Sequence, residues 1–220
     1  MNKPHGKRQP LQLGYSTNVH PGENMEAVYR SLEEYTVPIR ERVFGSESCG
    51  LELRLGIGAA KDLSTRRARL EFREFLEESG LVLFSVNAYP LSDFHARRVK
   101  ETVYQPSWVS PQRARWTSRI ARIVDEIAPA GLKVSISTLG GCFRGHGHGP
   151  AVFRKLAANY LQTLEALLEI EEALDDSLAD ILGGNQDVGG PKVVAPGLAH
   201  TETITTFHSA RFMADPAATN

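Results

Sequence analysis

The residues best suited to chemistry in this sequence are histidines, arginines and amides that follow short apolar segments. Asn18, His20 and Glu23 follow the first such segment, and Arg54 lies in the second. Histidine is the usual acid or base near neutral pH, and arginine binds carboxylates and phosphates. The third and fourth segments are followed by, or contain, Asn87, His95, Ser135, Ser137, Thr138, Arg144, His146 and His148. Structural roles explain Arg54 and Asn87 about as well as ligand binding does, because polar groups in apolar segments need partners in any case.

The glycine-rich loop at residues 140–150, GGCFRGHGHGP, offers two kinds of site. His146 and His148 are spaced as ligands of a divalent metal ion can be. Arg144, together with backbone N–H groups at the start of the following helix, suits a phosphate or carboxylate. The spacing matches neither a P-loop nor a dinucleotide-binding motif. A surface loop whose histidines serve solubility and turn geometry is the alternative, and the sequence leaves both open.

Four apolar segments predict the strands that must position these residues. The predicted strands are Leu11–Val19, Leu51–Ile57, Leu81–Ala88 and Leu132–Thr138. The second alternates strictly between apolar and other residues, and the third is nearly continuous in apolar residues, as a buried parallel strand should be.

Each predicted strand is followed by a segment with helical spacing. The first helix carries Met25, Val28, Leu32 and Tyr35 three or four residues apart, and a second over residues 62–79 turns Leu63, Phe72, Phe75 and Leu76 inward before a left-handed stop at Gly80. The third begins with the cap Ser110 and with Pro111, and places Trp116, Ile120, Ile123, Val124 and Ile127 on one face. The fourth, over residues 151–172, has the stripe Val152, Phe153, Leu156, Tyr160, Leu161, Leu164 and Leu168.

This alternation predicts an α/β fold in which parallel strands are joined by right-handed helical crossovers. An open doubly wound sheet and a (β/α)₈ barrel both fit the pattern. In either architecture ligands bind outside the carboxyl ends of the strands, so the candidate residues should share one rim. A complete barrel takes roughly 250 residues, so four units would form only its first half.

Composition excludes several classes of protein. Lys and Arg number 25 against 26 Asp and Glu, which is unlike a binder of nucleic acid that relies on electrostatics. No apolar run approaches the roughly 20 residues of a membrane-spanning helix, and no apolar stretch follows the basic N-terminus as in a secretory signal. Two cysteines are too few for a disulfide framework. We therefore expect a soluble, cytoplasmic protein.

Two regions have unusual charge. Residues 95–122 hold seven bases and one acid, a run that we interpret as the solvated face of helices rather than as a surface for anionic partners. Residues 173–220 hold six acids and two bases, and two Gly-Gly pairs interrupt them. We therefore expect a domain over residues 1–172 and a divergent, largely irregular tail over 173–220, in which ALDDSLADIL extends the preceding helix.

Several segments together resemble one family. LGYSTNVHPGE (13–23), LRLG (53–56), FSVNAYPLSDFHARRVKETVYQPSW (84–108) and VSISTLGG (134–141) are similar to the EboE proteins, metabolite traffic proteins with a xylose-isomerase-like barrel. The resemblance covers residues 12–172. It implies the first four units of a (β/α)₈ barrel, with His20, Glu23, Arg54, Asn87, His95 and Lys100 lining the upper mouth.

The sequence departs from that family after Glu172. Xylose-isomerase-like barrels take their metal ligands chiefly from later strands, which are not found here. Three functions stay open: a traffic protein that binds a small polar metabolite, a metal-dependent isomerase or epimerase that uses the histidines, and a non-catalytic remnant that acts through protein contacts. Because four parallel strands leave open edges, we expect a homo-oligomer or a partner that completes the barrel.

Overall fold

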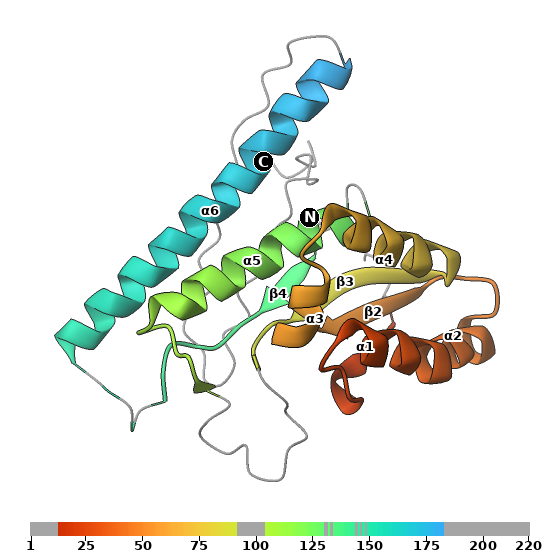
Figure 1. The fold of residues 1–220 in the computed structure, drawn as a ribbon, viewed down its shortest axis with the longest axis horizontal. Coiled ribbons are helices and arrows are strands. Elements are labelled where there is room, and N and C mark those ends of the chain that lie inside the picture. The colour runs from red at the N-terminus through yellow and green to blue at the C-terminus, as the bar shows by residue number, and fades with distance from the viewer. Residues whose placement is uncertain are drawn as a thin grey trace, which may run out of the picture.

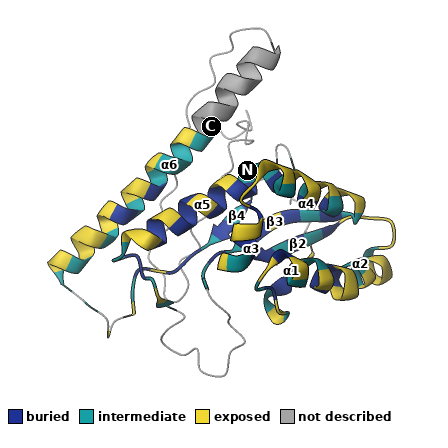
Figure 2. Cartoon of the chain, in the orientation of Figure 1, coloured by how far each residue is buried: buried dark blue, intermediate teal, exposed yellow. Residues whose placement is uncertain are grey.

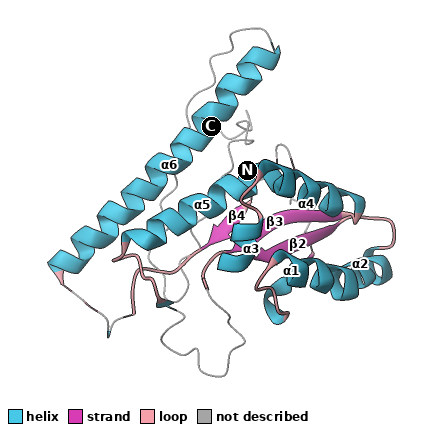
Figure 3. Cartoon of the chain, viewed as in Figure 1, coloured by secondary structure: helices cyan, strands magenta, loops and turns pink. Residues whose placement is uncertain are grey.

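The structure, a computed structural model, is a layer of helices packed on a parallel sheet (Figure 1). It describes residues 13–91, 104–129, 132, 134–143, 145, 147 and 149–182, the last twelve of these by their backbone alone. The sheet has four strands: β1 (Gly14–Ser16), β2 (Cys49–Arg54), β3 (Leu81–Asn87) and β4 (Ser135–Ser137). Figure 3 labels the last three, in magenta. The predicted mixed α/β fold with parallel strands is confirmed.

The strands lie in chain order, β1-β2-β3-β4. Each neighbouring pair is parallel, and the order does not reverse within the described residues, whereas doubly wound sheets reverse at a switch point. Right-handed crossovers in a single direction place the connecting helices on the same face of the sheet.

The helices form one continuous row over that face. The first unit contributes η1 (Thr17–Val19), α1 (Met25–Ser31), the π-helical η2 (Leu32–Thr36) and α2 (Val37–Phe44). The next units contribute α3 (Ile57–Asp62), α4 (Arg66–Glu78), α5 (Pro111–Ile127) and α6 (Pro150–Leu182). Tyr29 of α1 packs edge-on against Phe72 and Phe75 of α4, and Arg69 of α4 forms an ion pair with Glu126 of α5. In turn α5 packs against α6, so the row runs α1, α4, α5, α6.

The main core lies between this row and the sheet (Figure 2). Leu51, Leu53, Leu83, Val86 and Ile136 point from the strands into it. The predicted inner face of α5 is confirmed, since Trp116, Ile120, Ile123, Val124 and Ile127 are all buried. Gly80 has φ +63°, as the predicted left-handed stop requires.

Several predicted boundaries were wrong. The first strand is only three residues long because Ser16 caps η1 with its side chain, so the chain leaves the sheet there. The second strand ends at Arg54, because Gly56 caps α3 and Ile57 begins that helix. The fourth strand is limited to Ser135–Ser137.

Helix α6 differs from its predicted stripe. Leu156, Tyr160 and Leu164 pack against the body as predicted, whereas Phe153 and Leu161 are exposed. Asn159, Thr163 and Leu167 complete the inner side of the helix. The buried Asn159 donates to the Trp108 carbonyl, so a polar side chain occupies the inner face. The helix runs on to Leu182, so that ALDDSLADIL extends it as predicted. The domain boundary near residue 173 stays a prediction, and residues 183–220 lie outside the described part. No helix in that part is both long and apolar enough to cross a bilayer.

Candidate functional site

The sheet face turned away from the helices carries two rows of polar side chains. In a parallel sheet, residues in register point to the same face. One row crosses all four strands as Ser16, Glu52, Ser85 and Ser135. The second row, at the carboxyl ends of β2, β3 and β4, is Arg54, Asn87 and Ser137. Both rows are polar, whereas bulky branched residues dominate the interior of most barrels.

A chain of hydrogen bonds joins side chains from all four strand ends. The Asn18 Nδ2 group donates to Glu52 Oε1 at 3.4 Å, and Asn87 Nδ2 donates to Asn18 Oδ1 at 3.0 Å. The Ser137 hydroxyl donates to Asn87 Oδ1 at 3.4 Å, which extends the chain to β4. Sequence reasoning expected Asn18, Arg54, Asn87 and Ser137 to share one rim, and the structure brings these residues together there.

Below this chain, two strands meet through a serine pair. Ser135 Oγ donates to Ser85 Oγ at 2.9 Å. A bulge in β3 beside Leu51 and Glu52 shifts the register and places the ring of Phe84 on the same face. Gly14 and Gly50 lie beneath that ring, and a Cβ on either glycine would approach its Cε1 atom at 2.6 and 3.1 Å. On this face the Phe84 ring therefore lies next to the first polar row, on the side of the amino ends of the strands.

Arg54 connects the second row to the loop after β1. Its guanidinium is 2% exposed, and its Nη2 lies 3.2 Å from Glu23 Oε1, a carboxylate that is 43% exposed. The Arg54 backbone N–H donates to Thr17 Oγ1 at 2.8 Å, so the start of η1 is fixed against the end of β2. A buried guanidinium beside a half-exposed carboxylate can bind hydroxyl, carbonyl or anionic groups of a ligand.

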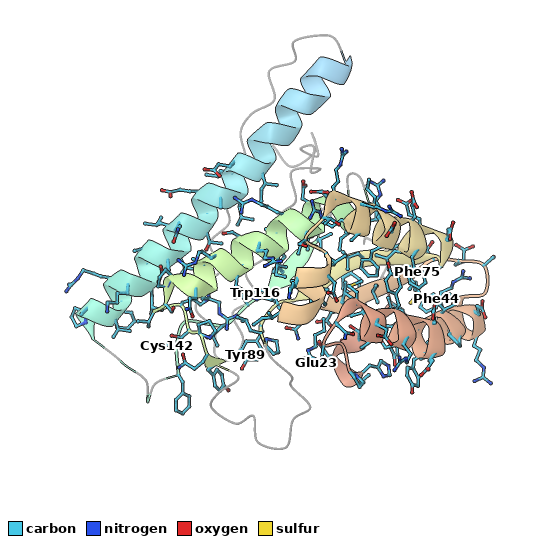
Figure 4. The ribbon with its side chains drawn as sticks, viewed as in Figure 1. Glu23, Phe44, Phe75, Tyr89, Trp116 and Cys142 are labelled. Carbon is cyan, nitrogen blue, oxygen red and sulfur yellow. The ribbon has the colours of Figure 1, made fainter. Side chains whose placement is uncertain are left out.

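The first turn of α3 holds two neighbouring loops at the same rim. The Ala59 N–H donates to the Glu23 carbonyl and the Ile57 N–H to the Leu91 carbonyl, each at 3.0 Å. Gly58 permits this approach, because a Cβ there would collide with the Glu23 carbonyl oxygen. In Figure 4 the labelled side chains of Cys142, Tyr89 and Glu23 lie along the lower side of the molecule, away from Phe44 and Phe75.

His20 lies beside this rim in an aromatic stack. Its ring is parallel to Tyr35 at 4.3 Å between centroids, and its Nε2 lies 2.7 Å from the Tyr15 hydroxyl. Tyr35 belongs to the π-helix η2, a kind of segment that is rare and often found at functional sites. The stack fixes the end of β1 against the first helical unit.

A second cluster surrounds the carboxyl ends of β3 and β4. The Trp108 indole stacks on Tyr160 and donates to the Leu139 carbonyl, which also accepts from the Tyr160 hydroxyl at 3.2 Å. Burial raises the pKa of Tyr160 to about 12, although the positive charge of Arg113 acts in the opposite direction.

Arg113 contradicts the prediction that the basic run is a solvated face. Its guanidinium is fully buried and donates to the carbonyls of Pro106, Ala88 and Tyr89. Burial lowers its pKa to about 10, partly offset by Tyr89 and Tyr160. Arg115, Arg119 and Arg122 are exposed as expected. Arg113 thus joins the residues that follow β3 to Pro106, which precedes α5.

The remaining candidates lie outside the described residues. These are His95, Lys100, Arg144, His146 and His148. Within the part that is described, no group of three His, Cys, Asp or Glu side chains is arranged to hold a metal ion. The expected divalent metal therefore stays a prediction.

Sequence reasoning missed Glu52 and the role of Arg113. Glu52 precedes Arg54 by two residues in an alternating strand, so the two had to share a face. That signal was present. The sequence also held a signal for Arg113, which precedes Trp116 by three residues and so lies on the buried stripe of α5, whereas the exposed arginines lie on the opposite stripe.

No protein-family model matches the chain, and no curated protein matches it significantly.

Proposed function

We propose that this chain binds a small polar metabolite at the carboxyl ends of its strands, as a segment of an isomerase-like barrel related to the EboE metabolite traffic proteins. The observation that carries the proposal is the hydrogen-bonded chain Glu52–Asn18–Asn87–Ser137, which crosses the sheet on the face without helices.

The chemistry of this face suits a ligand with several hydroxyl or carbonyl groups. Glu52 supplies an acceptor, the two amides supply both donors and acceptors, and the serines supply hydroxyls. Arg54 adds a fixed positive charge at the rim. The ring of Phe84 offers an apolar surface against which the carbon skeleton of such a ligand can pack.

The barrel part of the proposal is supported by the strand order. Four parallel strands in chain order, with neighbouring helices in contact along one row, are what successive units of a (β/α)₈ barrel form. The sheet alone is also compatible with other α/β arrangements, so the ligand is the part to test first.

Thermal unfolding with a panel of pentoses, hexoses and their phosphates tests the ligand. Binding to the native state raises the free energy of unfolding by about 2.7 kcal/mol at a hundredfold excess of ligand over Kd, and Tm rises with it. Glu52→Gln keeps the shape but removes the charge, and we expect it to abolish most of the shift. Glu74→Gln on the exposed surface of α4 is the matched control and should leave the shift unchanged.

An equal shift in Glu52→Gln and the native chain would contradict binding at this face. No shift with any compound of the panel would contradict the proposed ligand class.

A further inference from the structure

The two edges of the sheet have the same direction and the same length. β1 and β4 are each three residues long, and all strands are parallel. The Leu13 carbonyl accepts from the Gly50 N–H, so Leu13 directs its backbone groups toward β2. Because successive residues of a strand alternate, the N–H and C=O groups of Gly14 and Ser16 point away from β2. The Ser137 carbonyl accepts from the Ala88 N–H, so by the same alternation the N–H and C=O groups of Ile136 in β4 point away from β3. Among the described residues no further strand pairs with either edge, and edges of this kind are templates for pairing with another strand.

The edges fit each other when two copies are considered. If Ile136 of one copy lies opposite Tyr15 of the other, its N–H meets the Gly14 carbonyl and its C=O meets the Ser16 N–H. Ile136 and Tyr15 both belong to the core side of the sheet. Ser137 then lies beside Ser16, so the second polar row of one copy meets the first polar row of the other at the junction.

Exposed apolar side chains gather at the two ends of the molecule. Seven of the ten large apolar side chains that are exposed in the described part belong to the first or the last unit: Leu13, Val19, Tyr35, Val43, Phe143, Phe153 and Leu161. Helix α2, at one end of the helix row, has no buried residue. At the other end, α6 exposes Phe153 and Leu161. Figure 2 shows exposed positions, in yellow, along the described part of this helix. Both the strand layer and the helix layer therefore end in surfaces suited to a partner.

We infer that two copies of this chain join edge to edge, β4 of each to β1 of the other, about a two-fold axis. The described strands of two copies number eight, all parallel, which is the strand number of a (β/α)₈ barrel. The same axis brings α6 of one copy beside α1–α2 of its partner. Closure buries the second face of the sheet, as parallel sheets require, and places two sets of the Glu52–Asn18–Asn87–Ser137 chain around one interior.

Sedimentation velocity on the full chain tests this inference, with two variants of one edge residue. Ser16→Pro removes the outward N–H, which the β1–β2 ladder does not use, together with the side-chain cap. Ser16→Ala removes the cap but keeps the N–H. We expect the native chain and Ser16→Ala to be dimers. Since two edge hydrogen bonds are lost per dimer, Ser16→Pro should raise the dimer Kd by roughly tenfold or more.

Amide hydrogen exchange supplies a second measurement that does not depend on a variant. In the dimer the N–H groups of Ser16 and Ile136 are hydrogen-bonded, so their protection should grow with protein concentration. The N–H groups of Glu52 and Val86 lie inside the sheet and serve as the internal control.

A monomeric native chain would overturn the inference, and so would a trimer or larger ring. A dimer that Ser16→Pro leaves intact, with concentration-independent exchange at Ile136, would show that another surface joins the copies and would also overturn it. None of these outcomes bears on ligand binding, which the Glu52→Gln comparison tests separately.

Discussion

Asn87 makes three hydrogen bonds to three different segments. It donates to Asn18 after β1, and its carbonyl oxygen accepts from the Tyr89 backbone N–H at 3.0 Å and from Ser137 on β4. Such a side chain has structural value even without a ligand, because truncating it removes three hydrogen bonds from half-buried partners.

We therefore expect Asn87→Ala to lower the free energy of unfolding by about 1–3 kcal/mol. Urea unfolding followed by circular dichroism measures the change. Gln112→Ala, an exposed amide on α5, is the control and should stay within about 0.5 kcal/mol of the native chain. Equal stability of both variants would contradict the network.

The raised pKa of Tyr160 makes the free energy of unfolding fall as the pH becomes alkaline. Its folded pKa of about 12 lies above the ordinary value of 10.0, so the folded chain holds this proton more tightly than the unfolded chain. The resulting stabilisation is complete below pH 10 and is lost as pH rises through 12. At pH 11 about 1.4 kcal/mol of it is lost, which is one pKa unit.

Tyr160→Phe removes that dependence. We expect the native chain to lose about 1 kcal/mol more than the variant between pH 9 and pH 11. The lowered pKa of Arg113 acts with the opposite sign in the same range and is present in both chains, so the difference between the profiles reports Tyr160 together with its attraction to Arg113. Parallel pH profiles would mean that the phenol is not buried as described.

At the residue scale, alternation and strand ends predicted much of the site. Asn18, Arg54, Asn87 and Ser137 could be grouped because parallel strands point their carboxyl ends in one direction. The stacking of His20 between tyrosines could not be predicted, since it depends on the π-helical turn that brings Tyr35 over its ring.

At the scale of elements, the Phe84 ring of β3 packs over the glycines of β1 and β2, where any larger side chain would crowd it. Phe84 stands in the β3 bulge, and Gly50 leaves room for its ring, with a Cβ there lying 3.0 Å from Cδ1 and 3.1 Å from Cε1. The bulge could not be read from the sequence, because the apolar run of β3 shows no break in its period.

We expect Gly50→Ala to cost about 1–3 kcal/mol through this crowding. In a Phe84→Leu background the cost should fall, because the smaller side chain gives way, which corresponds to a coupling of about 0.5–3 kcal/mol. A double-mutant cycle by chemical denaturation measures it. If Gly50→Ala costs the same with Phe84 and with Leu at position 84, the Phe84 ring does not contact Gly50.

At the scale of the whole molecule, the structure is a row of units that each contact the next. The ring contacts of Tyr29 with α4, the ion pair Arg69–Glu126 and the packing of α5 on α6 join successive units. In such a row each inner unit is covered by a neighbour on both sides, whereas the first and last units are covered on one side only. The sequence predicted the units from local periodicity, but it could not show that the first and last would be left with exposed apolar side chains, because that depends on which units become neighbours.

If the ends join two copies, stability must depend on protein concentration. A tenfold increase in concentration should then raise Tm by roughly 1–3 °C, since association stabilises the folded chain by mass action. Leu161→Glu, at an end of the row, should flatten this dependence. Ile57→Glu, also more than half exposed but on an inner unit, should preserve it. Differential scanning calorimetry over a hundredfold range of concentration distinguishes the two, and a Tm that does not change with concentration in the native chain would mean that each copy folds and melts alone.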